Sequence, residues 1–305
     1  MKATLMSLVA ACSLMACANN AKTGATENAP AAETAEPAAQ TEKTADATET
    51  QAEQGASEGD SQENTFENGI LTLNGVRYDF ALVKGGIFTM GASPDVKDAE
   101  DCEKPAHEVT IGYNYYIGKT EVTVALWKAV TGNYPAGLDE NDLNKPVDNV
   151  SQADLESFFE DLGAMVGNIF FIPTEEEWEF AARGGNNSKH YIYSGSNTLS
   201  DVAWNEEGNI VYHGYDVATK KPNELGIYDM SGNLAEWCTY WKNENDHGYV
   251  LRGGNCTSRE AYCRVSYRED APEAYVFEDR TPALIGFRLR CSESWEEDME
   301  GEDGI

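Results

Sequence analysis

The residues best suited to chemistry in this 305-residue sequence are two cysteines, Cys256 and Cys263. They follow a Gly-Gly pair in the stretch VLRGGNCTSREAYCRVSYR, which also contains four arginines. A thiolate is a nucleophile and a soft metal ligand that selects copper(I), and two suitably placed thiolates can hold copper(I) nearly linearly. In an oxidising compartment the same residues can instead form a disulfide. Three interpretations stay open: a reactive or copper-binding pair, a disulfide, and two unrelated thiols.

The number of cysteines leaves the pairing undetermined. Beyond residue 17 the chain has five cysteines, so at least one is unpaired or bonded elsewhere. They are Cys102, Cys238, Cys256, Cys263 and Cys291.

A second set of candidate ligands lies in the stretch YDMSGNLAEW. A hard cation such as calcium takes several oxygen ligands from carboxylates and backbone carbonyls of a flexible loop. Asp229 and Glu236 offer carboxylates here, and Gly232 and Leu234 offer carbonyls between them. The alternative is a turn in which Asn233 caps the following residues and the two acids face solvent.

Other standard chemistries find no support in the sequence. The four histidines lack the spacings of common metal sites, and no Gly-x-Ser-x-Gly elbow or phosphate-binding loop is present. Lys and Arg number 22 against 53 Asp and Glu, which makes the formal net charge −31. Because nucleic-acid binding needs clustered Lys and Arg to neutralise phosphates, this balance argues against nucleic acid as a partner.

Two helices are predicted among the elements that position these residues. Ser151 can cap a helix over 152–165, in which four apolar residues form one stripe. Thr174 and Glu177 form a capping box for a second helix, which Gly184 ends. The acids of this second helix are interpreted as first-turn charges that the helix dipole favours, next to a buried tryptophan. The apolar stripe of the first helix consists of Leu155, Phe158, Phe159 and Leu162.

Short strands are predicted before these helices. Residues 69–91 alternate apolar and polar side chains around the turn signals Asn74-Gly75 and Gly85-Gly86, and 107–123 reads as another strand pair. The remaining sequence is dense in Gly, Asn and Pro, which predicts long ordered loops around few elements. The predicted fold class is α+β.

The N-terminus predicts an exported protein. Residues 1–16 read as a signal peptide, in which one lysine precedes an apolar run too short to span a bilayer. The sequence Leu14-Met15-Ala16-Cys17 resembles a bacterial lipobox, which implies cleavage before Cys17 and lipidation of its sulfur. An ordinary signal peptide with an incidental cysteine is the alternative. A lipid anchor would hold the protein on a membrane of the bacterial cell envelope.

Composition divides the remaining chain. Residues 17–68 are rich in Ala, Glu, Thr, Gln and Gly, so they cannot bury enough apolar surface to fold and predict a disordered acidic stalk. Residues 292–305 predict a disordered acidic tail. The segment 69–291 between them is long enough for one large domain.

Eight motifs in order carry a resemblance to a known family. They are GGIFTMG, EKPAHEVTI, KTEVTVALWKAVTG, PVDNVS, FIPTEEEWEFAARGG, KPNELGIYDMSGNLAEW, VLRGGN and GFRLR. Together they resemble the formylglycine-generating enzyme, or sulfatase-modifying factor, domain. The resemblance implies a single C-type-lectin-like domain with little regular secondary structure. Some members oxidise a sulfatase cysteine to formylglycine, and others are surface or secretion lipoproteins with no demonstrated chemistry.

The resemblance also implies site residues. It places a structural calcium ion on Asp229, Gly232, Leu234 and Glu236. At the reacting centre, Tyr262 and Cys263 match the family's tyrosine and second copper cysteine.

Four positions depart from the pattern of the active enzymes. Ser258 stands where the first copper cysteine is expected, Asn255 where a serine is expected, and Arg259 where a histidine is common. Ala235 replaces a usual tryptophan. Cys256 lies two residues before the expected ligand, which in an extended segment shifts the sulfur by about 6–7 Å. These departures weigh against copper oxidase chemistry.

Two hypotheses follow. The first is a lipid-anchored envelope protein that uses the scaffold as a binding or assembly module for a peptide or protein. The alternative is a copper-dependent oxidase that makes formylglycine on an exported sulfatase, with Cys263 as reactive thiolate and Cys256 as displaced copper ligand. Convergence of the two sulfurs in one cleft without bonding would favour the oxidase. The substrate-binding residues expected in the altered pocket are Asn255, Arg259, Tyr262 and Arg288.

Overall fold

The computed structural model describes residues 64–205, 212–243, 246–271 and 284–293. The predicted signal peptide, the lipidation site Cys17, most of the stalk and most of the acidic tail lie outside the described residues.

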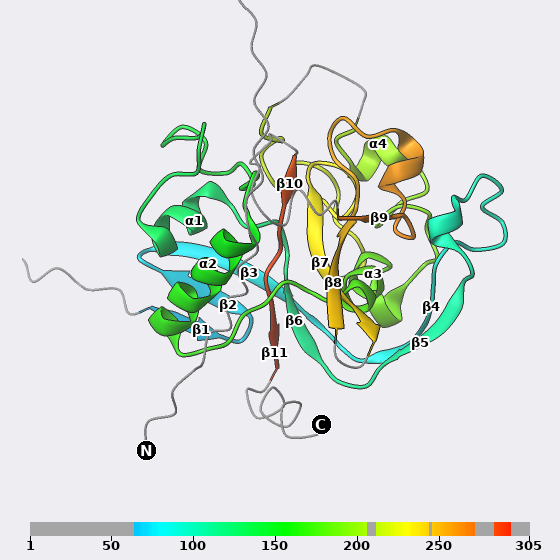
Figure 1. Cartoon of the computed structure of the whole chain (residues 1–305), viewed down its shortest axis with the longest axis horizontal. Coiled ribbons are helices and arrows are strands. Elements are labelled where there is room, and N and C mark those ends of the chain that lie inside the picture. The colour runs from blue at the N-terminus through cyan, green and yellow to red at the C-terminus, as the bar shows by residue number, and fades with distance from the viewer. Residues whose placement is uncertain (1–63, 206–211, 244–245, 272–283, 294–305) are drawn as a thin grey trace, which may run out of the picture. The chain divides into compact units, whose positions relative to one another are not determined.

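The first sheet has five antiparallel strands in the order β1-β2-β3-β6-β11 (Figure 1). The hairpin predicted at Asn74-Gly75 is confirmed, because Leu73 pairs with Val76 and both turn residues have positive φ. The strands are β1 (Thr65–Glu67), β2 (Ile70–Leu73), β3 (Val76–Val83), β6 (Tyr115–Gly118) and β11 (Arg290–Ser292).

A few residues on either side of the predicted domain 69–291 also belong to the fold. β1 belongs to the sheet, and Phe66 packs edge-on against three core rings at centroid distances of 5.2–5.7 Å. The stalk therefore cannot extend to residue 68. At the other end, Ser292 is the last residue of β11, and Glu293 accepts a hydrogen bond from Asn114.

The prediction that two strands within 107–123 pair with each other is wrong, although both strands are present. β5 (His107–Ile111) pairs with β4 (Gly86–Met90), whereas β6 pairs with β3. β3 and β4 therefore form one edge of a long antiparallel ribbon, and β5 and β6 form the other edge. The β4–β5 end of this ribbon is seen beyond β3 and β6 in Figure 1.

The Gly85-Gly86 signal marks a bulge in this ribbon and not a turn. Val83 pairs with Tyr115 and Gly86 pairs with Ile111, so two residues on one strand face three on the other. A Cβ on Gly85 would lie 2.6 Å from the carbonyl oxygen of Ile111, so only glycine allows this approach.

The second sheet has the order β10-β7-β8-β9, with β10 parallel to β7 and the other pairs antiparallel. α3 (Glu175–Ala182) packs on β7. The strands are β7 (Ala235–Asn243), β8 (Asp246–Arg252), β9 (Arg268–Asp270) and β10 (Ile285–Gly286).

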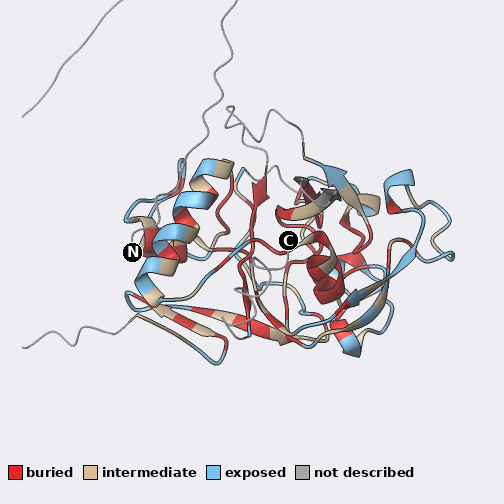
Figure 2. Ribbon diagram, turned by 60° about the horizontal axis from the view of Figure 1, so that its bottom comes forward, coloured by how far each residue is buried: buried red, intermediate tan, exposed pale blue. Residues whose placement is uncertain are grey.

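Two helices cover the first sheet. α2 (Gln152–Val166) begins at Ser151, as predicted, and a capping box joins Ser151 to Asp154. Three residues of its predicted apolar stripe are buried and Phe159 is partly buried, while the opposite face is exposed (Figure 2). α1 (Val124–Thr131) was not predicted; its Leu126 and Val130 join the same core.

α3 forms the centre of a second core. Its predicted capping box between Thr174 and Glu177 is confirmed, the helix is followed by Gly184 at φ 88°, and Trp178 is fully buried. The remaining regular elements are short, as the α+β prediction with long loops requires. They are α4 (Leu199–Val202) and the 3-10 turns η1 (Asp101–Glu103), η2 (Gly185–Asn187) and η3 (Glu260–Cys263). Within the described residues, no helix has the length and apolar content to cross a membrane.

Candidate functional site

The altered centre is a tight loop that leaves β8 at Arg252. Gly253 and Gly254 have φ of 87° and 65°, and a Cβ on Gly254 would lie 2.6 Å from the carbonyl oxygen of Tyr262. Glycine is therefore required for the loop to fold back on itself. The loop continues into η3, which ends at Cys263.

Asn255 and Ser258 bind each other within this loop. The Asn255 backbone N–H donates to Ser258 Oγ at 2.9 Å, and Ser258 Oγ lies 3.3 Å from Asn255 Oδ1. Asn255 Oδ1 also accepts bonds from the backbone N–H and the hydroxyl of Thr257. The serine that stands in place of the first copper cysteine therefore closes a turn.

Cys263 is buried and its thiol stays neutral. It has no exposed surface and packs in a small apolar cluster with Tyr193 and Leu199. Burial raises the pKa of the thiol to about 12, and the charges of Glu260 and Cys256 act in the same direction. Since the thiolate is the nucleophile and the metal ligand, this environment works against both roles.

Cys256 lies in a different apolar cluster, with Leu234 and Leu284. Its backbone N–H donates to the carbonyl of Asn233, and burial raises the pKa of its thiol. Cys256 and Cys263 are both free thiols, so the structure contains no disulfide between them.

This arrangement does not fit a copper(I) site. Cys256 and Cys263 belong to separate apolar clusters, and Ser258 offers oxygen where a soft metal needs sulfur. Across the described part of the chain, no group of three or more His, Cys, Asp or Glu is placed to hold a metal ion.

The prediction that Arg288 binds substrate is wrong. Its guanidinium is fully buried and donates to the Glu236 carboxylate, at 2.6 Å for the shortest bond, and to the carbonyls of Gly118 and Tyr228. These bonds hold the loop before β7 to the first sheet. Because this side chain is fully buried and each of its three nitrogens already donates to a protein acceptor, a substrate cannot reach it.

The other three predicted substrate residues lie together on one loop. Asn255 is partly buried, Arg259 is exposed, and the Tyr262 ring packs at a tilt against the Tyr267 ring, with centroids 4.8 Å apart. Their convergence is local, because they are neighbours in the chain.

The predicted calcium loop is buried and partly satisfied by protein groups. Asp229 accepts a bond from the Ala218 N–H through Oδ2, while its Oδ1 is buried without a hydrogen-bond partner. Burial raises the pKa of Asp229 to about 6. Both oxygens of Glu236 already accept bonds, from Arg288 and from the indole N–H of Trp178. The orphaned oxygen fits a cation, and the calcium site stays a prediction.

Glu121 is a buried carboxylate that the sequence reasoning missed. Its Oε1 accepts a bond from Asn233, its Oε2 has no hydrogen-bond partner, and burial together with the charge of Asp229 raises its pKa well above the usual range. It lies in the motif KTEVT, 108 residues before Asp229 in the chain, so no local spacing could have joined the two.

The acids of α3 are also more than first-turn charges. Three of its glutamates are buried, and each faces an arginine from a distant strand. The pairs are Glu175–Arg268, Glu177–Arg290 and Glu179–Arg252.

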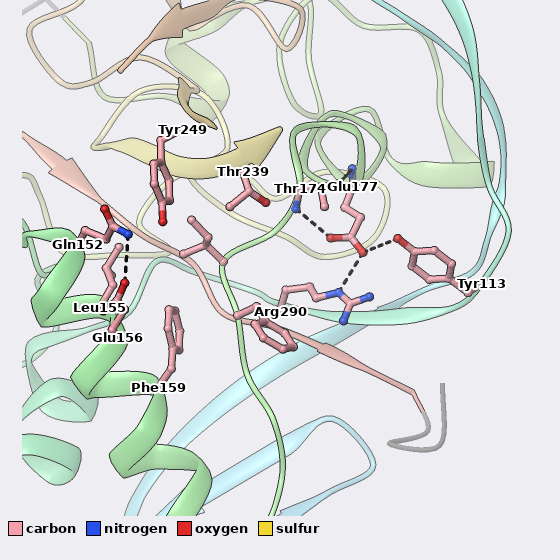
Figure 3. Close-up of a pocket in the computed structure, with 12 residues that line it drawn as sticks. Tyr113, Gln152, Leu155, Glu156, Phe159, Thr174, Glu177, Thr239, Tyr249 and Arg290 are labelled. Carbon is pink, nitrogen blue, oxygen red and sulfur yellow. Dashed lines mark hydrogen bonds and ion pairs between the residues drawn. The ribbon is translucent and has the colours of Figure 1, made fainter. Parts of the chain in front are cut away.

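A cavity of about 400 Å³ lies between α2, the segment 171–174 and the strands β7, β8 and β11 (Figure 3). Leu155 and Phe159 of α2 form one wall, and Tyr249 of β8 lies opposite. At the far end, Glu177 accepts bonds from Tyr113 and Arg290. The sequence reasoning missed this pocket, because its lining comes from six separate stretches of chain.

Comparison with known proteins identifies the family. The sequence model of the sulfatase-modifying factor enzyme 1-like domain matches residues 75–291, so the chain belongs to this family. The predicted family and fold class are thereby confirmed.

Three relatives illustrate the range of the family. Chaperone protein LppX of Paenibacillus barcinonensis is 29% identical over 242 residues, covering 62% of this chain and 82% of that protein. Formylglycine-generating enzyme of Thermomonospora curvata is 29% identical, covering 54% and 60%. Inactive C-alpha-formylglycine-generating enzyme 2 of Bos taurus is 31% identical, covering 43% and 44%. The chain thus spans less than two thirds of the last two proteins.

Solved structures share the fold. Treponema denticola variable protein 1 superposes with a TM-score of 0.59 at 28% identity, covering 73% of this chain and 98% of that one. PvdO from Pseudomonas aeruginosa superposes with a TM-score of 0.56 at 22% identity, covering 71% and 94%.

Proposed function

We propose that this protein is a lipid-anchored component of the bacterial cell envelope in which the sulfatase-modifying factor domain is a binding or assembly module and not an oxidase. The altered centre is the observation that carries the proposal. Ser258 closes a turn where the family pattern has a copper cysteine, and Cys263 is a buried thiol whose pKa is raised to about 12.

The names of two relatives support this proposal. One is called an inactive formylglycine-generating enzyme and another a chaperone protein, so the family includes members named for something other than oxidation. Lipidation at Cys17 is part of the proposal and rests on the lipobox resemblance alone.

We infer that the pocket of Figure 3 is the ligand site. The surface that lines it is mainly apolar, and its volume suits one or two large side chains of a peptide. Phe171, one of its lining residues, is 45% exposed, although its backbone pairs with Arg290. Burial of such a side chain against a ligand contributes about 1.5–3 kcal/mol.

The first experiment tests the absence of oxidase activity. The full chain is incubated with copper(I), oxygen and a Cys-x-Pro-x-Arg peptide, beside a Ser258→Cys variant and a Ser258→Ala control. We expect no aldehyde in the peptide mass from the wild type or Ser258→Ala, and stronger copper(I) binding by Ser258→Cys. Aldehyde formation by the wild type that is lost in Cys263→Ala would overturn the proposal.

The second experiment tests the pocket. Peptides selected from a random displayed library against the full chain are measured on Phe171→Ser and on Ile169→Ser, a matched control. Ile169 is 46% exposed on the same segment and does not line the pocket. We expect Phe171→Ser to weaken binding about tenfold or more and Ile169→Ser to leave it unchanged. Equal affinity for both variants would place the ligand elsewhere.

We also propose that calcium binds at Asp229, Gly232, Leu234 and Glu236. The supporting observation is the buried Asp229 oxygen without a partner. Calcium at a hundred times its dissociation constant should stabilise the fold by about 2.7 kcal/mol. We expect a rise in Tm with calcium that Asp229→Asn abolishes and that Asp216→Asn, at an exposed carboxylate, keeps. An unchanged Tm of the wild type would refute the site.

A further inference from the structure

A second cavity, of about 520 Å³, lies against β4, and residues of the segment 183–192 form its other wall. It shares no lining residue with the pocket of Figure 3. β4 and β5 form a two-stranded sheet (Figure 1), so within the described residues β4 pairs with another strand along one edge only. Three consecutive residues of β4 line the cavity, Ile87, Phe88 and Thr89, together with Gly91 just after the strand.

The backbone of Gly91 shows which edge of β4 the cavity borders. Its N–H donates to Glu179 Oε1 at 2.8 Å and its C=O accepts from Arg183 Nη2 at 2.7 Å, and Arg183 lines the cavity. The next residue, Ala92, donates in the other direction, to the carbonyl of Glu103 in the turn that leads into β5. Because successive strand residues direct their N–H and C=O groups to opposite edges, every second residue before Gly91 faces the cavity edge and the others face β5.

Ile87 and Thr89 therefore place their N–H and C=O groups on an open edge. Across the described residues, neither forms a hydrogen bond with a group outside the β4–β5 pair. The positions on both sides are occupied by side chains, since the C=O of Gly85 accepts from Asn186 Nδ2 at 2.9 Å and Gly91 is bonded as described above. The edge is thus open over a length that suits one short strand.

The open edge lacks the features that usually prevent another strand from adding to a sheet. Edge strands are commonly protected by charged side chains or proline. β4 has the sequence GIFTM, which contains neither, and its Ile87 side chain is 63% exposed. β5, in contrast, begins with the exposed residues His107 and Glu108. The less protected strand of the ribbon is therefore the one that borders the cavity.

The charges of the cavity match an uncharged ligand. Of the described residues that line it, one is acidic, Asp95, and the basic groups are His190 and Arg183. The guanidinium of Arg183 is already paired with Glu179 at 2.6 Å. Apolar surface comes from Ile192, which is 38% exposed, and from the isoleucine of β4. An extended segment without charges and with one apolar side chain is complementary to this lining.

We propose that this cavity binds an uncharged, extended peptide segment, which adds to the open edge of β4 as a third strand. The backbone of the segment exchanges hydrogen bonds with Ile87 and Thr89, and one of its apolar side chains lies against Ile87 and Ile192. Main-chain bonds supply affinity in this mode of recognition, so the site selects an extended conformation and lack of charge more than a particular sequence.

Hydrogen exchange of the full chain, followed by NMR, tests the open edge directly. In the free protein we expect the amides of Ile87 and Thr89 to exchange faster than those of Phe88 and Met90, which face β5. The probe is the peptide Ac-Thr-Val-Thr-Val-Thr-NH2 at millimolar concentration, which should slow exchange at Ile87 and Thr89. The control is the same peptide with N-methyl groups on its third and fourth residues, which blocks both of its edges and should not bind.

The substitution Thr89→Pro removes one N–H from the open edge. Proline is tolerated at edge positions whose N–H does not bond within the sheet, so we expect the Tm to change little. The affinity for the probe should fall about threefold to tenfold, as for the loss of one hydrogen bond. Thr89→Val is the matched control, because it keeps the N–H and the shape of the side chain, and it should bind the probe unchanged.

Four results would overturn the proposal. They are slow exchange at Ile87 and Thr89 in the free protein, no slowing by the probe, equal binding of the N-methylated peptide, and equal affinity of Thr89→Pro and Thr89→Val. Equal binding of Ac-Thr-Glu-Thr-Glu-Thr-NH2 would refute the selection against charge. If Thr89→Pro is unfolded by circular dichroism, Ile87→Ser decides in its place and should weaken the probe about two- to fivefold. Phe171→Ser should leave the probe unaffected, and weaker binding by that variant would assign the probe to the pocket of Figure 3.

Discussion

At the scale of single residues, buried arginines hold the glutamates of this domain in place. Three arginines with 3% or less exposed surface each bind one buried glutamate. Such pairs add little net stability when formed, but removing one partner leaves an uncompensated buried charge. The pairs are Arg252–Glu179, Arg264–Glu103 and Arg288–Glu236.

The substitution Arg288→Gln tests the structural role of this arginine. It leaves the Glu236 carboxylate buried without its cation, so we expect a loss of about 3–5 kcal/mol in the free energy of unfolding. Arg77→Gln is the control, because Arg77 pairs with Asp79 at the exposed surface and should leave the urea midpoint unchanged. Equal midpoints for the two variants would show that Arg288 is not the anchor described here.

The protonation of Cys263 predicts its reactivity. Because burial raises the pKa of this thiol from 9.0 to about 12, the folded protein keeps its proton between those values while the unfolded chain loses it. The neutral thiol therefore stabilises the fold below pH 9, and that contribution is lost as the pH rises from 9 to 12. At pH 8 we expect iodoacetamide to modify the exposed Cys102 and to leave Cys263 unmodified.

Peptide mapping after alkylation measures this outcome. The protein denatured in urea is the control, in which both cysteines should be labelled. Stoichiometric labelling of Cys263 in the native protein at pH 8 would contradict the prediction that this thiol is buried and unreactive. It would favour the oxidase alternative.

At the scale of elements, the start of α3 joins helix capping to the pocket of Figure 3. Glu177 accepts the backbone N–H of Thr174 through Oε2, at 2.9 Å. Through Oε1 the same side chain accepts Tyr113 at 3.0 Å and Arg290 at 2.9 Å. The capping box therefore also orients the polar end of the pocket.

The substitution Thr174→Ala removes the hydroxyl that caps α3. We expect a loss of about 1 kcal/mol in stability, together with weaker binding of the selected peptides because Glu177 is less firmly held. Ser151→Ala removes the equivalent cap of α2 and should cost about the same without touching Glu177. Unfolding and peptide titrations of both variants check this, and equal peptide affinities would separate the cap from the pocket.

At the scale of the whole domain, residues 284–293 join the two sheets. β10 runs parallel to β7 in the second sheet, and β11 closes the first sheet against β6. Between them Phe287 and Leu289 are fully buried in the main core. The segment 284–293 thus contributes one strand to each sheet.

Truncation tests this closure. A chain ending at residue 283 lacks β10 and β11, so we expect it to show no cooperative thermal transition. A chain ending at residue 293 removes only residues 294–305, outside the described part, and should keep the Tm of the full chain. Calorimetry of the two truncations measures the difference, and a cooperative transition in the shorter chain would contradict the closing role of this segment.

The sequence by itself determined two kinds of feature: local structure formed by residues close together in the chain, and membership of the family. The caps at Ser151 and Thr174, the end of α3 at Gly184 and the hairpin at Asn74-Gly75 each depend on residues within a few positions of one another. Eight ordered motifs were enough to identify the family and the α+β class. The four differences from the active enzymes at the reacting centre could also be identified from the sequence, because each is a single position in a known motif.

Only the tertiary structure decided the rest, because it depends on contacts between residues far apart in the chain. It paired β3–β4 with β5–β6 in place of the two predicted hairpins, and it assigned Arg288 to Glu236 and not to a substrate. It placed Cys256 and Cys263 in separate apolar clusters and assembled the pocket of Figure 3 from distant stretches. Turn and cap chemistry acts over three or four residues, whereas burial, ion pairing and cavities arise only when distant segments pack together.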